Sequence, residues 1–445
     1  MTTYDFAAIG LGPFNLGLAC LTEPIDELDG VFLEAGDEFD WHPGMLLEDT
    51  TLQVPFMADL VTMADPTSRF SFLAYLKDIG RLYSFYIRED FNPLRAEYNN
   101  YCRWAANQLG SVRFGRHVDR VEHDGEAYVV RCRLRSGESE TVRARRLVLG
   151  TGTQPFVPDA VRDLDGPVIH NADYLQGKAA LQAKDSITII GSGQSAAEVY
   201  LDLLEEIDTF GYTLNWITRS PRFFPMEYTK LTLEMTSPEY ASYFHALPAT
   251  TRDRLVTEHK PLYKGISGDL VDAIFDTLYR KRVNGDFTSN LLTNTELTGA
   301  SWDSSAGRYA LDLLHTEQDE SFALETGGLV LATGYRGHVP GFVAPIADRI
   351  RWDDRGRYAV APGYTIDHGD KEIFVQNAEE HTHGFVAPDL GMGAYRNSSI
   401  IAAMCGREVY PIEQRIAFQT FGVPARQPHP RQPPARQPQD REVGV

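Results

Sequence analysis

Two segments of the chain share one order of elements: a buried strand, a glycine-rich turn and the start of a helix. The first strand, Tyr4–Ile9, leads into Gly10-Leu11-Gly12-Pro13-Phe14-Asn15, and the second, Ser186–Ile190, leads into Gly191-Ser192-Gly193-Gln194-Ser195-Ala196. Glycine permits the tight turn and the close approach of a pyrophosphate, and the helix N-terminus supplies oriented N–H donors. We therefore predict an α/β fold with two Rossmann-like dinucleotide-binding domains and a small strand-rich third region.

The first turn departs from the usual fingerprint at its third glycine, where Asn15 stands. The following short strand, Val31–Leu33, ends at Glu34. An acid about 20 residues beyond the turn is typical of the residue that binds a ribose hydroxyl. Strand, turn, helix and acid together indicate a nucleotide site.

The second unit differs after its second strand, Thr213–Thr218, where Arg219 and Arg222 follow instead of an acid. A carboxylate there would repel a 2′-phosphate, whereas a guanidinium would bind it. This favours NADPH over NADH, and solvated surface arginines are the alternative. Two apolar strands also end in Gly150-Thr151-Gly152 and Ala332-Thr333-Gly334, where small residues allow close passage of a cofactor or a simple tight turn. Two nucleotide folds in one chain suit electron transfer from a nicotinamide to a flavin.

Composition excludes several classes of function. The chain has 445 residues, enough for two or three domains, and 43% of them are hydrophobic. The net charge of −20 disfavours nucleic acid and anionic membranes as partners. We find no apolar run of about 18 residues and no signal peptide, so we expect a cytoplasmic protein. The four cysteines lack a C-x-x-C pair, which argues against a disulfide framework, a zinc ribbon and a dithiol centre.

Five further segments, taken with the two turns, resemble the class B flavin monooxygenases, and within them the microbial N-hydroxylases of siderophore biosynthesis. The segments are Trp41–Met45, Phe56–Pro66, Phe70–Leu76, Ala332–Tyr335 and His381–Gly384, and the resemblance extends from Tyr4 to about Phe421. It implies FAD in the first unit and NADPH in the second. It also implies that NADPH reduces FAD, that O2 forms a C4a-hydroperoxyflavin, and that a neutral primary amine becomes a hydroxylamine.

We expect the chain to comprise four segments of folded domains, which the resemblance implies, and a tail, which composition indicates. We expect an FAD-binding domain in residues 1–166, an NADPH-binding domain in 167–284, a small substrate-side region in 285–333 and a return segment of the FAD-binding domain in 334–423. Residues 424–445 are rich in Pro, Arg and Gln, which predicts a disordered tail without a catalytic role.

The resemblance also assigns roles to residues. Gln53 matches a glutamine beside the flavin ring and is the predicted catalytic residue, Arg95 matches an arginine that contacts NADPH, and His381–Gly384 matches a stretch that returns to the flavin. The predicted cofactor-binding residues are Gly10, Gly12, Pro13, Phe14, Asn15, Glu34, Trp41, His42, Met45, Gln53, Arg95, Thr151, Gly152, Gly191, Ser192, Gly193, Gln194, Ser195, Arg219, Arg222, Thr333, Gly334 and Leu390. No metal is predicted, because no acid or cysteine completes a site with His381 and His383, which would share one face of a strand.

One departure from the family pattern bears on the substrate. Amino-acid hydroxylases of this family carry a lysine that binds the α-carboxylate, but this chain has Ala58 there. They also carry Asn-Tyr-Ser where this chain has Leu262-Tyr263-Lys264. A buried carboxylate without a partner is costly, which predicts a carboxylate-free diamine such as cadaverine or putrescine. Asp389, Glu379 and Glu380 are candidates for binding its distal ammonium.

Two other functions remain open. Lys264 could replace the missing lysine, which would make the protein an L-lysine N6-monooxygenase. Alternatively, the protein could be an uncoupled flavin NADPH oxidase or redox sensor that releases peroxide. In the main hypothesis the partners are a small amine and O2, the product supplies hydroxamate siderophore biosynthesis, and the resemblance suggests a homodimer or homotetramer.

Overall fold

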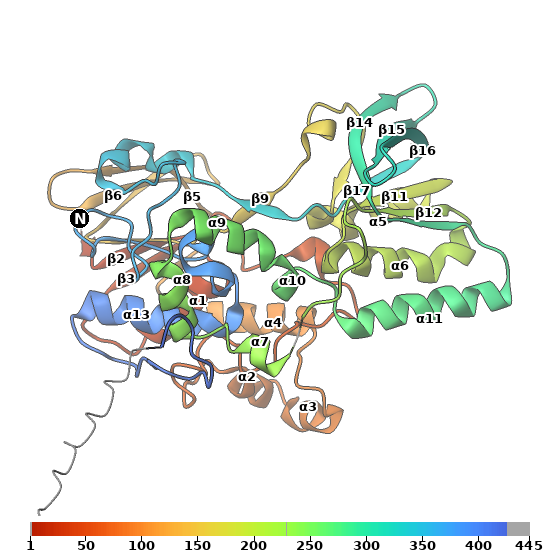
Figure 1. Ribbon diagram of the computed structural model, residues 1–445. Coiled ribbons are helices and arrows are strands. Elements are labelled where there is room, and N and C mark those ends of the chain that lie inside the picture. Colours follow the sequence, from red (N-terminus) through yellow and green to blue (C-terminus); the bar gives the residue numbers. More distant parts are fainter. Residues whose placement is uncertain (1, 228, 425–445) are drawn as a thin grey trace, which may run out of the picture.

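In the computed structural model, which describes residues 2–227 and 229–424, each glycine turn follows the central strand of its own parallel sheet (Figure 1). The first sheet has the order β19-β8-β2-β3-β4 and the second has the order β10-β17-β11-β12-β13. The first comprises β2 (Phe6–Ile9), β3 (Gly30–Leu33), β4 (Val112–Arg113), β8 (Leu147–Leu149) and β19 (Ile373–Val375). The second comprises β10 (Ile169–His170), β11 (Ser186–Ile190), β12 (Thr213–Ile217), β13 (Ser289–Leu292) and β17 (Gly328–Leu331). The predicted α/β fold with two Rossmann-like units is confirmed.

The first sheet is covered by helices on one face and by a strand layer on the other. α1 (Pro13–Thr22) contacts both α4 (Arg95–Ala106) and α13 (Gly393–Cys405). The opposite layer contains β1 (Thr3–Tyr4), β5 (Arg116–His123), β6 (Tyr128–Leu134) and β7 (Ser139–Ala144), and the 3-10 helix η4 (Gly341–Arg349) packs on it. Because β19 lies far along the chain, both ends of the sequence build this domain. The helices α2 (Phe72–Asp78) and α3 (Leu82–Arg88) complete its lower side.

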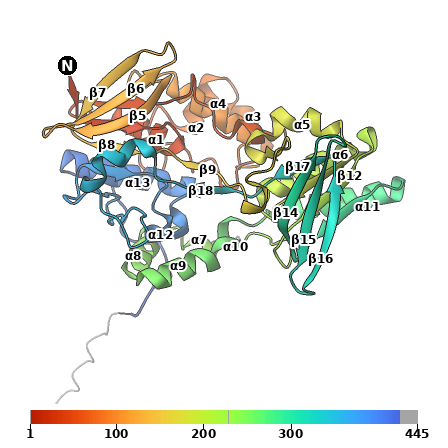
Figure 2. The same cartoon turned by 90° about the horizontal axis from the view of Figure 1, so that it is seen from above.

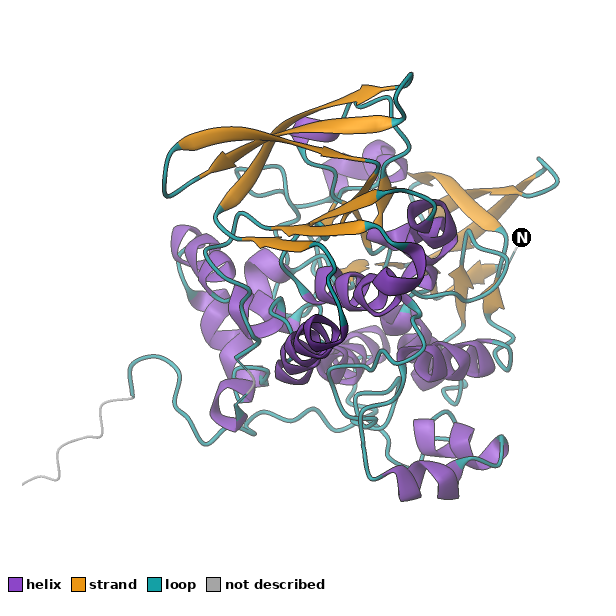
Figure 3. Cartoon of the chain, turned by 90° about the vertical axis from the view of Figure 1, so that its right-hand side faces the viewer, coloured by secondary structure: helices purple, strands orange, loops and turns teal. Residues whose placement is uncertain are grey.

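The second sheet carries α5 (Tyr174–Gln182), α6 (Gln194–Phe210) and α11 (Gly268–Asn284) on its helical side. An antiparallel layer of β14 (Thr295–Asp303), β15 (Arg308–His315) and β16 (Glu320–Thr326) packs on its other face. Figure 3 looks at this domain from its outer side, with the strands above the helices. Leu311 and Leu313 of β15 are buried against Ile190 and Leu331 of the parallel sheet.

The predicted boundaries of the 285–333 region need correction. β13 and β17 lie inside that range, yet both are strands of the second parallel sheet. All four residues of β17 are buried, so this strand needs neighbours on both faces. β13 and β17 therefore belong to the second domain, while β14, β15 and β16 form a separate antiparallel sheet that packs on it.

A helical excursion crosses from the second domain to the first. It comprises α7 (Lys230–Leu233), α8 (Pro238–Ala246), α9 (Ala249–Glu258) and α10 (Lys260–Tyr263). Its two ends meet where the backbone N–H of Met226 donates to the carbonyl of Ile266 at 2.8 Å. α8 and α9 contact the return segment at α12 (Glu380–His383) and at the 3-10 helix η5 (Gly384–Val386) (Figure 2). The predicted 167–284 range is therefore not one continuous domain.

Two short strands join the domains. β9 (Thr153–Pro155) and β18 (Tyr335–Gly337) pair in antiparallel fashion between the two bodies (Figure 2). They follow the Thr151-Gly152 and Thr333-Gly334 turns directly, and the hydroxyl of Thr333 donates to the carbonyl of Phe156. Remaining short 3-10 helices are η1 (Pro43–Met45), η2 (Asp159–Val161), η3 (Asn171–Asp173) and η6 (Leu390–Met392). In the described part of the chain, no helix has the length and apolar character needed to cross a membrane.

A buried ion pair holds the return segment. The guanidinium Nε of Arg396 lies 3.1 Å from the carboxylate of Glu379, and both side chains are almost fully buried. Arg396 also donates to the carbonyl of Ala387 at 2.6 Å and lies 4.5 Å over the ring of Phe14. This pair therefore connects α13, the segment before α12 and the start of α1.

We expect Gly44→Ala to destabilise the contact between η1 and η3. A Cβ at position 44 would lie 2.0 Å from the carbonyl oxygen of Ala172, and its three nearest atoms would all be backbone atoms, which cannot turn away. Overpacking of this kind costs about 1–3 kcal/mol in the free energy of unfolding, measured by urea denaturation. Gly110→Ala is the matched control, because nothing lies within 4 Å of its added Cβ. Equal stability of both variants would contradict the prediction.

We expect Arg396→Met to cost about 3–5 kcal/mol of folding stability, because it leaves the Glu379 carboxylate buried without its partner. The double variant Arg396→Met/Glu379→Gln should recover part of that loss, since it removes the uncompensated charge. Chemical denaturation of the single and double variants measures this coupling. A double variant less stable than the single one would show that the ion pair is not the source of the effect.

Candidate active site

Side chains from distant segments fix the first glycine turn. Gly10 has a φ of 86°, and an added Cβ would lie 2.5 Å from the carbonyl oxygen of Gly150, so only glycine fits. The Asn15 amide donates to the Gly10 carbonyl at 2.7 Å and accepts from Gln376 Nε2 at 2.9 Å. Asn15, in place of the third glycine, thus ties the turn to the return segment.

Glu34 lies beside the same turn. Its carboxylate accepts from the backbone N–H of Leu11 at 2.7 Å and of Gly36 at 2.8 Å. The acid at the end of β3 therefore sits at the mouth of the turn, where the fingerprint places a ribose. Glu34 stays a predicted cofactor residue.

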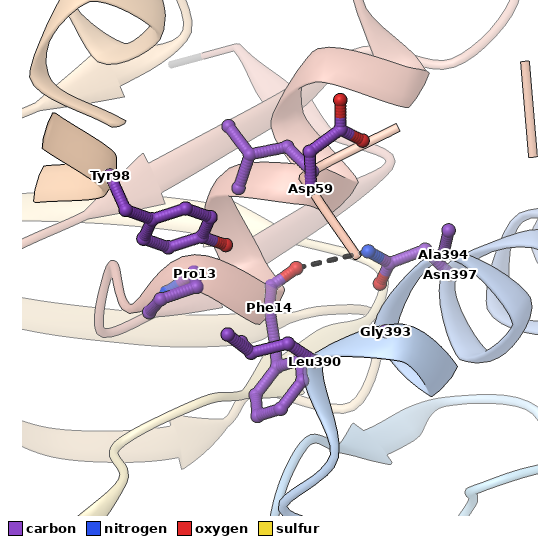
Figure 4. A pocket seen from close by; sticks show the side chains of 9 residues that line it. Pro13, Phe14, Asp59, Tyr98, Leu390, Gly393, Ala394 and Asn397 are labelled. Carbon is purple, nitrogen blue, oxygen red and sulfur yellow. Dashed lines mark hydrogen bonds between the residues drawn. The ribbon is translucent and has the colours of Figure 1, made fainter. Parts of the chain in front are cut away.

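Two helix N-termini meet at a small pocket next to this turn (Figure 4). Pro13 and Phe14 begin α1, Gly393 and Ala394 begin α13, and all four line the pocket. The other lining residues are Asp59, Leu60, Tyr98, Leu390 and Asn397. The Asn397 amide donates to the Phe14 carbonyl at 3.0 Å, as the dashed line in Figure 4 shows. Two positive helix ends fit the phosphates and carbonyl oxygens of a flavin dinucleotide.

The residues predicted to lie beside the flavin ring form an aromatic edge. The ring of His42 lies 4.9 Å from that of Trp41 and 5.4 Å from that of Tyr335, between centroids. His42 adopts a left-handed φ of 53°, an unusual conformation for a non-glycine residue and one that often marks a functional site. Burial and the nearby Arg95 charge lower the pKa of His42 to about 4, so its imidazole is neutral at pH 7.

Arg95 connects the two domains at this edge. Its guanidinium donates to the carbonyl of Met45 at 2.9 Å and forms a two-point ion pair with Glu198 of α6, at 2.8 and 2.9 Å. The segment that carries Gln53 pairs with the start of α4, since Arg95 N donates to the Thr50 carbonyl at 2.8 Å. The structure thus places Arg95 against Met45, and the segment just before Gln53 against the start of α4.

The second glycine turn is built like the first. Gly191 has a φ of 146°, and an added Cβ would lie 2.2 Å from the Ala332 carbonyl oxygen. Gln194 donates to Glu198 at 3.0 Å and accepts from Ser267 N at 2.9 Å, so the Arg95 ion pair reaches this turn. Gly193 caps α6 without a side-chain hydrogen bond, and Ser195 lies in its first turn. The helix end therefore fits a pyrophosphate.

The two arginines after β12 lie on the surface beside that turn. The side chain of Arg219 is 77% exposed, and its nearest acid, Glu296, is 3.9 Å away. The Arg222 guanidinium lies 4.3 Å over the ring of Phe224. Ser220, which lies between them in sequence, has its hydroxyl oxygen 3.2 Å from that of Ser192 in the turn. Loosely held guanidinium groups at this place fit a 2′-phosphate, which remains a prediction.

Two predicted substrate acids serve the fold. Glu379 is fully buried against Arg396, which corrects its assignment as a residue that faces substrate. Asp389 caps η6 by accepting from Gly391 N at 2.8 Å, and burial raises the pKa of its carboxyl. Asp389 is held by a backbone N–H only two residues away, whereas Glu379 is held by Arg396 of α13.

Ala58 is a buried and uncharged residue beside a buried acid, Asp59. Ala58 is 7% exposed. The carboxylate of Asp59, the next residue, is already hydrogen-bonded. It accepts from the backbone N–H groups of Val61, Thr62 and Phe72 at 2.6–2.9 Å. The local turn and the start of α2 therefore depend on Asp59.

Lys264 is paired with an acid. Its ammonium lies 3.6 Å from the carboxylate of Glu380 and 5.0 Å from the centre of the Tyr263 ring. The Tyr263 hydroxyl donates to the same carboxylate. The Glu380 side chain is 37% exposed, whereas the neighbouring Glu379 is fully buried.

The two histidines of the return segment contact the backbone. His381 lies 2.8 Å from the Tyr358 carbonyl, and His383 lies 3.5 Å from the Pro362 carbonyl. They belong to the short helix α12, which corrects the expectation that they alternate along a strand. Burial lowers the pKa of His383 to about 3, so it is neutral. Among the described residues, no group of three or more His, Cys, Asp or Glu side chains is arranged to hold a metal ion.

Comparison with known proteins reaches the same family from the whole chain. Residues 2–337 match the family model described as L-lysine 6-monooxygenase/L-ornithine 5-monooxygenase. The chain is 54% identical over 424 residues to a putrescine N-hydroxylase of Shewanella oneidensis, covering 94% of this chain and 84% of that protein.

Two solved structures extend the comparison. DfoA of Erwinia amylovora, a cadaverine monooxygenase of the desferrioxamine pathway bound to FAD, superimposes with a TM-score of 0.94 at 54% identity, covering 96% of this chain and all of that one. The ornithine N-hydroxylase of Kutzneria sp. 744, with reduced FAD, NADP⁺ and L-ornithine, gives a TM-score of 0.84 at 27% identity, covering 91% of this chain and 99% of that one. The chain therefore belongs to the L-lysine 6-monooxygenase/L-ornithine 5-monooxygenase family.

Proposed function

We propose that this enzyme uses FAD, NADPH and O2 to hydroxylate one nitrogen of an aliphatic diamine, putrescine or cadaverine. Similar proteins named for putrescine and cadaverine support this choice, as does the more distant match to an ornithine enzyme. In the balanced reaction, the amine, O2, NADPH and a proton give the hydroxylamine, NADP⁺ and water. The product would supply hydroxamate siderophore biosynthesis.

One observation carries the proposal: both positions that could bind a substrate carboxylate are unsuited to it. Ala58 offers no charge. Lys264 is next to Glu380, so a carboxylate brought to Lys264 would also meet a negative group. Like charges at short distance oppose binding, and a desolvated carboxylate without a partner is costly. A diamine avoids both penalties.

The protein's own residues would bind and orient the two cofactors. When bound, FAD accepts electrons from NADPH and activates O2. The Gly10 turn, Glu34 and the pocket between α1 and α13 would hold FAD, with Trp41, His42, Met45 and Gln53 along its ring. The Gly191 turn, Arg219 and Arg222 would hold NADPH. The two-point Arg95–Glu198 ion pair would keep the two sites in register.

The other hypotheses gain less support. L-lysine N6-hydroxylation would need Lys264 to leave Glu380 and bind a carboxylate beside that acid. An uncoupled oxidase or redox sensor would consume NADPH without amine-dependent product. We further propose that the enzyme works in the cytoplasm, where thiols stay reduced, since all four cysteines are free. A homodimer or homotetramer remains our expectation, and Phe275, Tyr279 and Val283 form an exposed apolar stripe on α11 that suits such contacts.

The experiment that tests the function measures hydroxylamine formed per NADPH consumed with putrescine, cadaverine, L-lysine and L-ornithine in turn. We expect coupled product with a diamine and little with the amino acids. Coupled product with L-lysine alone would overturn the proposal. Peroxide release without hydroxylamine for every amine would favour the oxidase.

Ala58→Lys should lower kcat/KM for the diamine about tenfold or more, since a change of about 1.4 kcal/mol corresponds to tenfold. A cation placed on the wall of the site would repel a cationic substrate. Ala58→Met is the matched control for length without charge. A loss of the same size in both variants would point to crowding and would contradict the charge argument.

Replacing Arg219 and Arg222 together by Ala should raise KM for NADPH about tenfold or more, because each charge-assisted hydrogen bond contributes about 1.5–3 kcal/mol. KM for NADH should change much less, since NADH lacks the 2′-phosphate. Steady-state flavin reduction with both nucleotides measures the ratio. Parallel changes for the two nucleotides would assign the 2′-phosphate to other residues.

A further inference from the structure

A compact cluster of three side chains stands at the junction of the two domains. Glu380 begins α12, and Tyr263 and Lys264 end the helical excursion. The Tyr263 hydroxyl donates to the Glu380 carboxylate, and the Lys264 ammonium lies 3.6 Å from it. The Tyr263 ring stacks on Phe385 at 5.8 Å with an angle of 20° between the planes. Phe385 belongs to η5, so the return segment holds the tyrosine in place.

The cluster lies between the two glycine turns. An added Cβ on Gly193 of the second turn would be 3.4 Å from the Lys264 carbonyl oxygen. On the other side, Glu380 follows Gln376 by four residues, and Gln376 donates to Asn15 of the first turn at 2.9 Å. The cluster is therefore adjacent to the second turn in space and lies four residues beyond a residue that contacts the first turn.

The chemistry of the cluster suits a primary ammonium. A carboxylate supplies the opposite charge, and the face of a tyrosine ring attracts a cation within about 6 Å. Lys264 already places a primary ammonium against both groups, at 3.6 Å from the acid and 5.0 Å from the ring centre. This ammonium has the same form as the distal end of a protonated diamine. The cluster thus shows an occupied ammonium position.

Lys264 can leave this position at low cost. Its side chain is 50% exposed, and that of Glu380 is 37% exposed. Ion pairs with this much solvent contact add little to stability, since water and salt screen them. The other two acids considered from the sequence are committed elsewhere, Glu379 to Arg396 and Asp389 to the Gly391 N–H.

We propose that Glu380 binds the distal ammonium of the diamine, that Tyr263 orients its carboxylate, and that Lys264 occupies the position until the diamine displaces it. This inference rests on the proposed function and adds the residue that selects a second amino group. It predicts discrimination between a diamine and a monoamine of equal length. It also predicts that Lys264 competes with the substrate ammonium for Glu380. This is the opposite of the alternative in which Lys264 binds a substrate carboxylate.

The test compares putrescine with n-butylamine, which has the same carbon chain and one amino group. We expect Glu380→Gln to lower the ratio of kcat/KM for putrescine to that for n-butylamine at least about tenfold, mainly through KM for putrescine, because a charge-assisted contact is lost. Lys264→Met should lower KM for putrescine severalfold, since the internal competitor is gone. FAD content and thermal stability equal to those of the wild type check folding, and Glu380→Asp serves if Glu380→Gln does not fold.

The outcomes separate the inference from the function it rests on. Coupled hydroxylation of putrescine by the wild type with an unchanged putrescine to n-butylamine ratio in Glu380→Gln overturns the inference alone. A higher KM for putrescine in Lys264→Met overturns the competitor role, because it means that Lys264 aids binding. Absence of coupled product with every diamine in the wild type overturns the proposed function itself.

Discussion

The buried Arg396–Glu379 ion pair is the contact on which the arrangement of the site depends. Arg396 lies on α13, Glu379 precedes α12, and the guanidinium also contacts the Ala387 carbonyl and the Phe14 ring. Two charges in the interior are stable only with close mutual pairing and added hydrogen bonds. The pair therefore fixes the return segment against the first glycine turn. It also places the adjacent residue, Glu380, where it faces Lys264.

A second ion pair has a comparable effect across the two domains. Arg95 comes from the first domain and Glu198 from the second, and both side chains are largely buried. Glu198 also accepts from Gln194 at the start of α6. The bidentate geometry restricts orientation as well as distance. Together with the β9–β18 linker, it holds two dinucleotide sites in one relative position, which transfer of electrons between two bound cofactors requires.

The sequence was sufficient for the parts of the fold that depend on local pattern. Both glycine turns, the strands before them and Glu34 lie where the β-turn-α fingerprint places them. It was insufficient where pairing is distant. β13 and β17 look like strands of a separate region, but they pair with strands far earlier in the chain. Ser289 of β13 pairs with Leu214 of β12, 75 residues before it, and Gly328 of β17 pairs with Ile187 of β11, 141 residues before it. α8 and α9 interrupt the second domain in sequence and yet contact the first, because their apolar faces pack against Phe385.

The acids show the same limit within one dipeptide. Glu379 and Glu380 have the same side chain, but Glu379 is fully buried and Glu380 is partly exposed. Glu379 stands just before the four-residue helix α12 and Glu380 begins it, so their side chains point to different neighbours. Glu379 contacts Arg396 and Glu380 contacts Lys264. No propensity or spacing rule distinguishes them, because the difference comes from α13 and the helical excursion, which are far apart in sequence. Site chemistry here follows from tertiary contacts.

Loss of the lysine at position 58 does not by itself select a diamine. An uncharged wall at Ala58 would accept monoamines and diamines alike, since it neither attracts nor repels a distal group. Selection of a diamine over a monoamine needs a second group that binds the distal cation. An acid that is paired with a weakly held lysine meets that need. The lysine neutralises the carboxylate when substrate is absent, and a substrate ammonium can displace the lysine when it binds. In our proposal, the absent charge at position 58 and the exchangeable charge at position 264 would together give a specificity that neither residue provides alone.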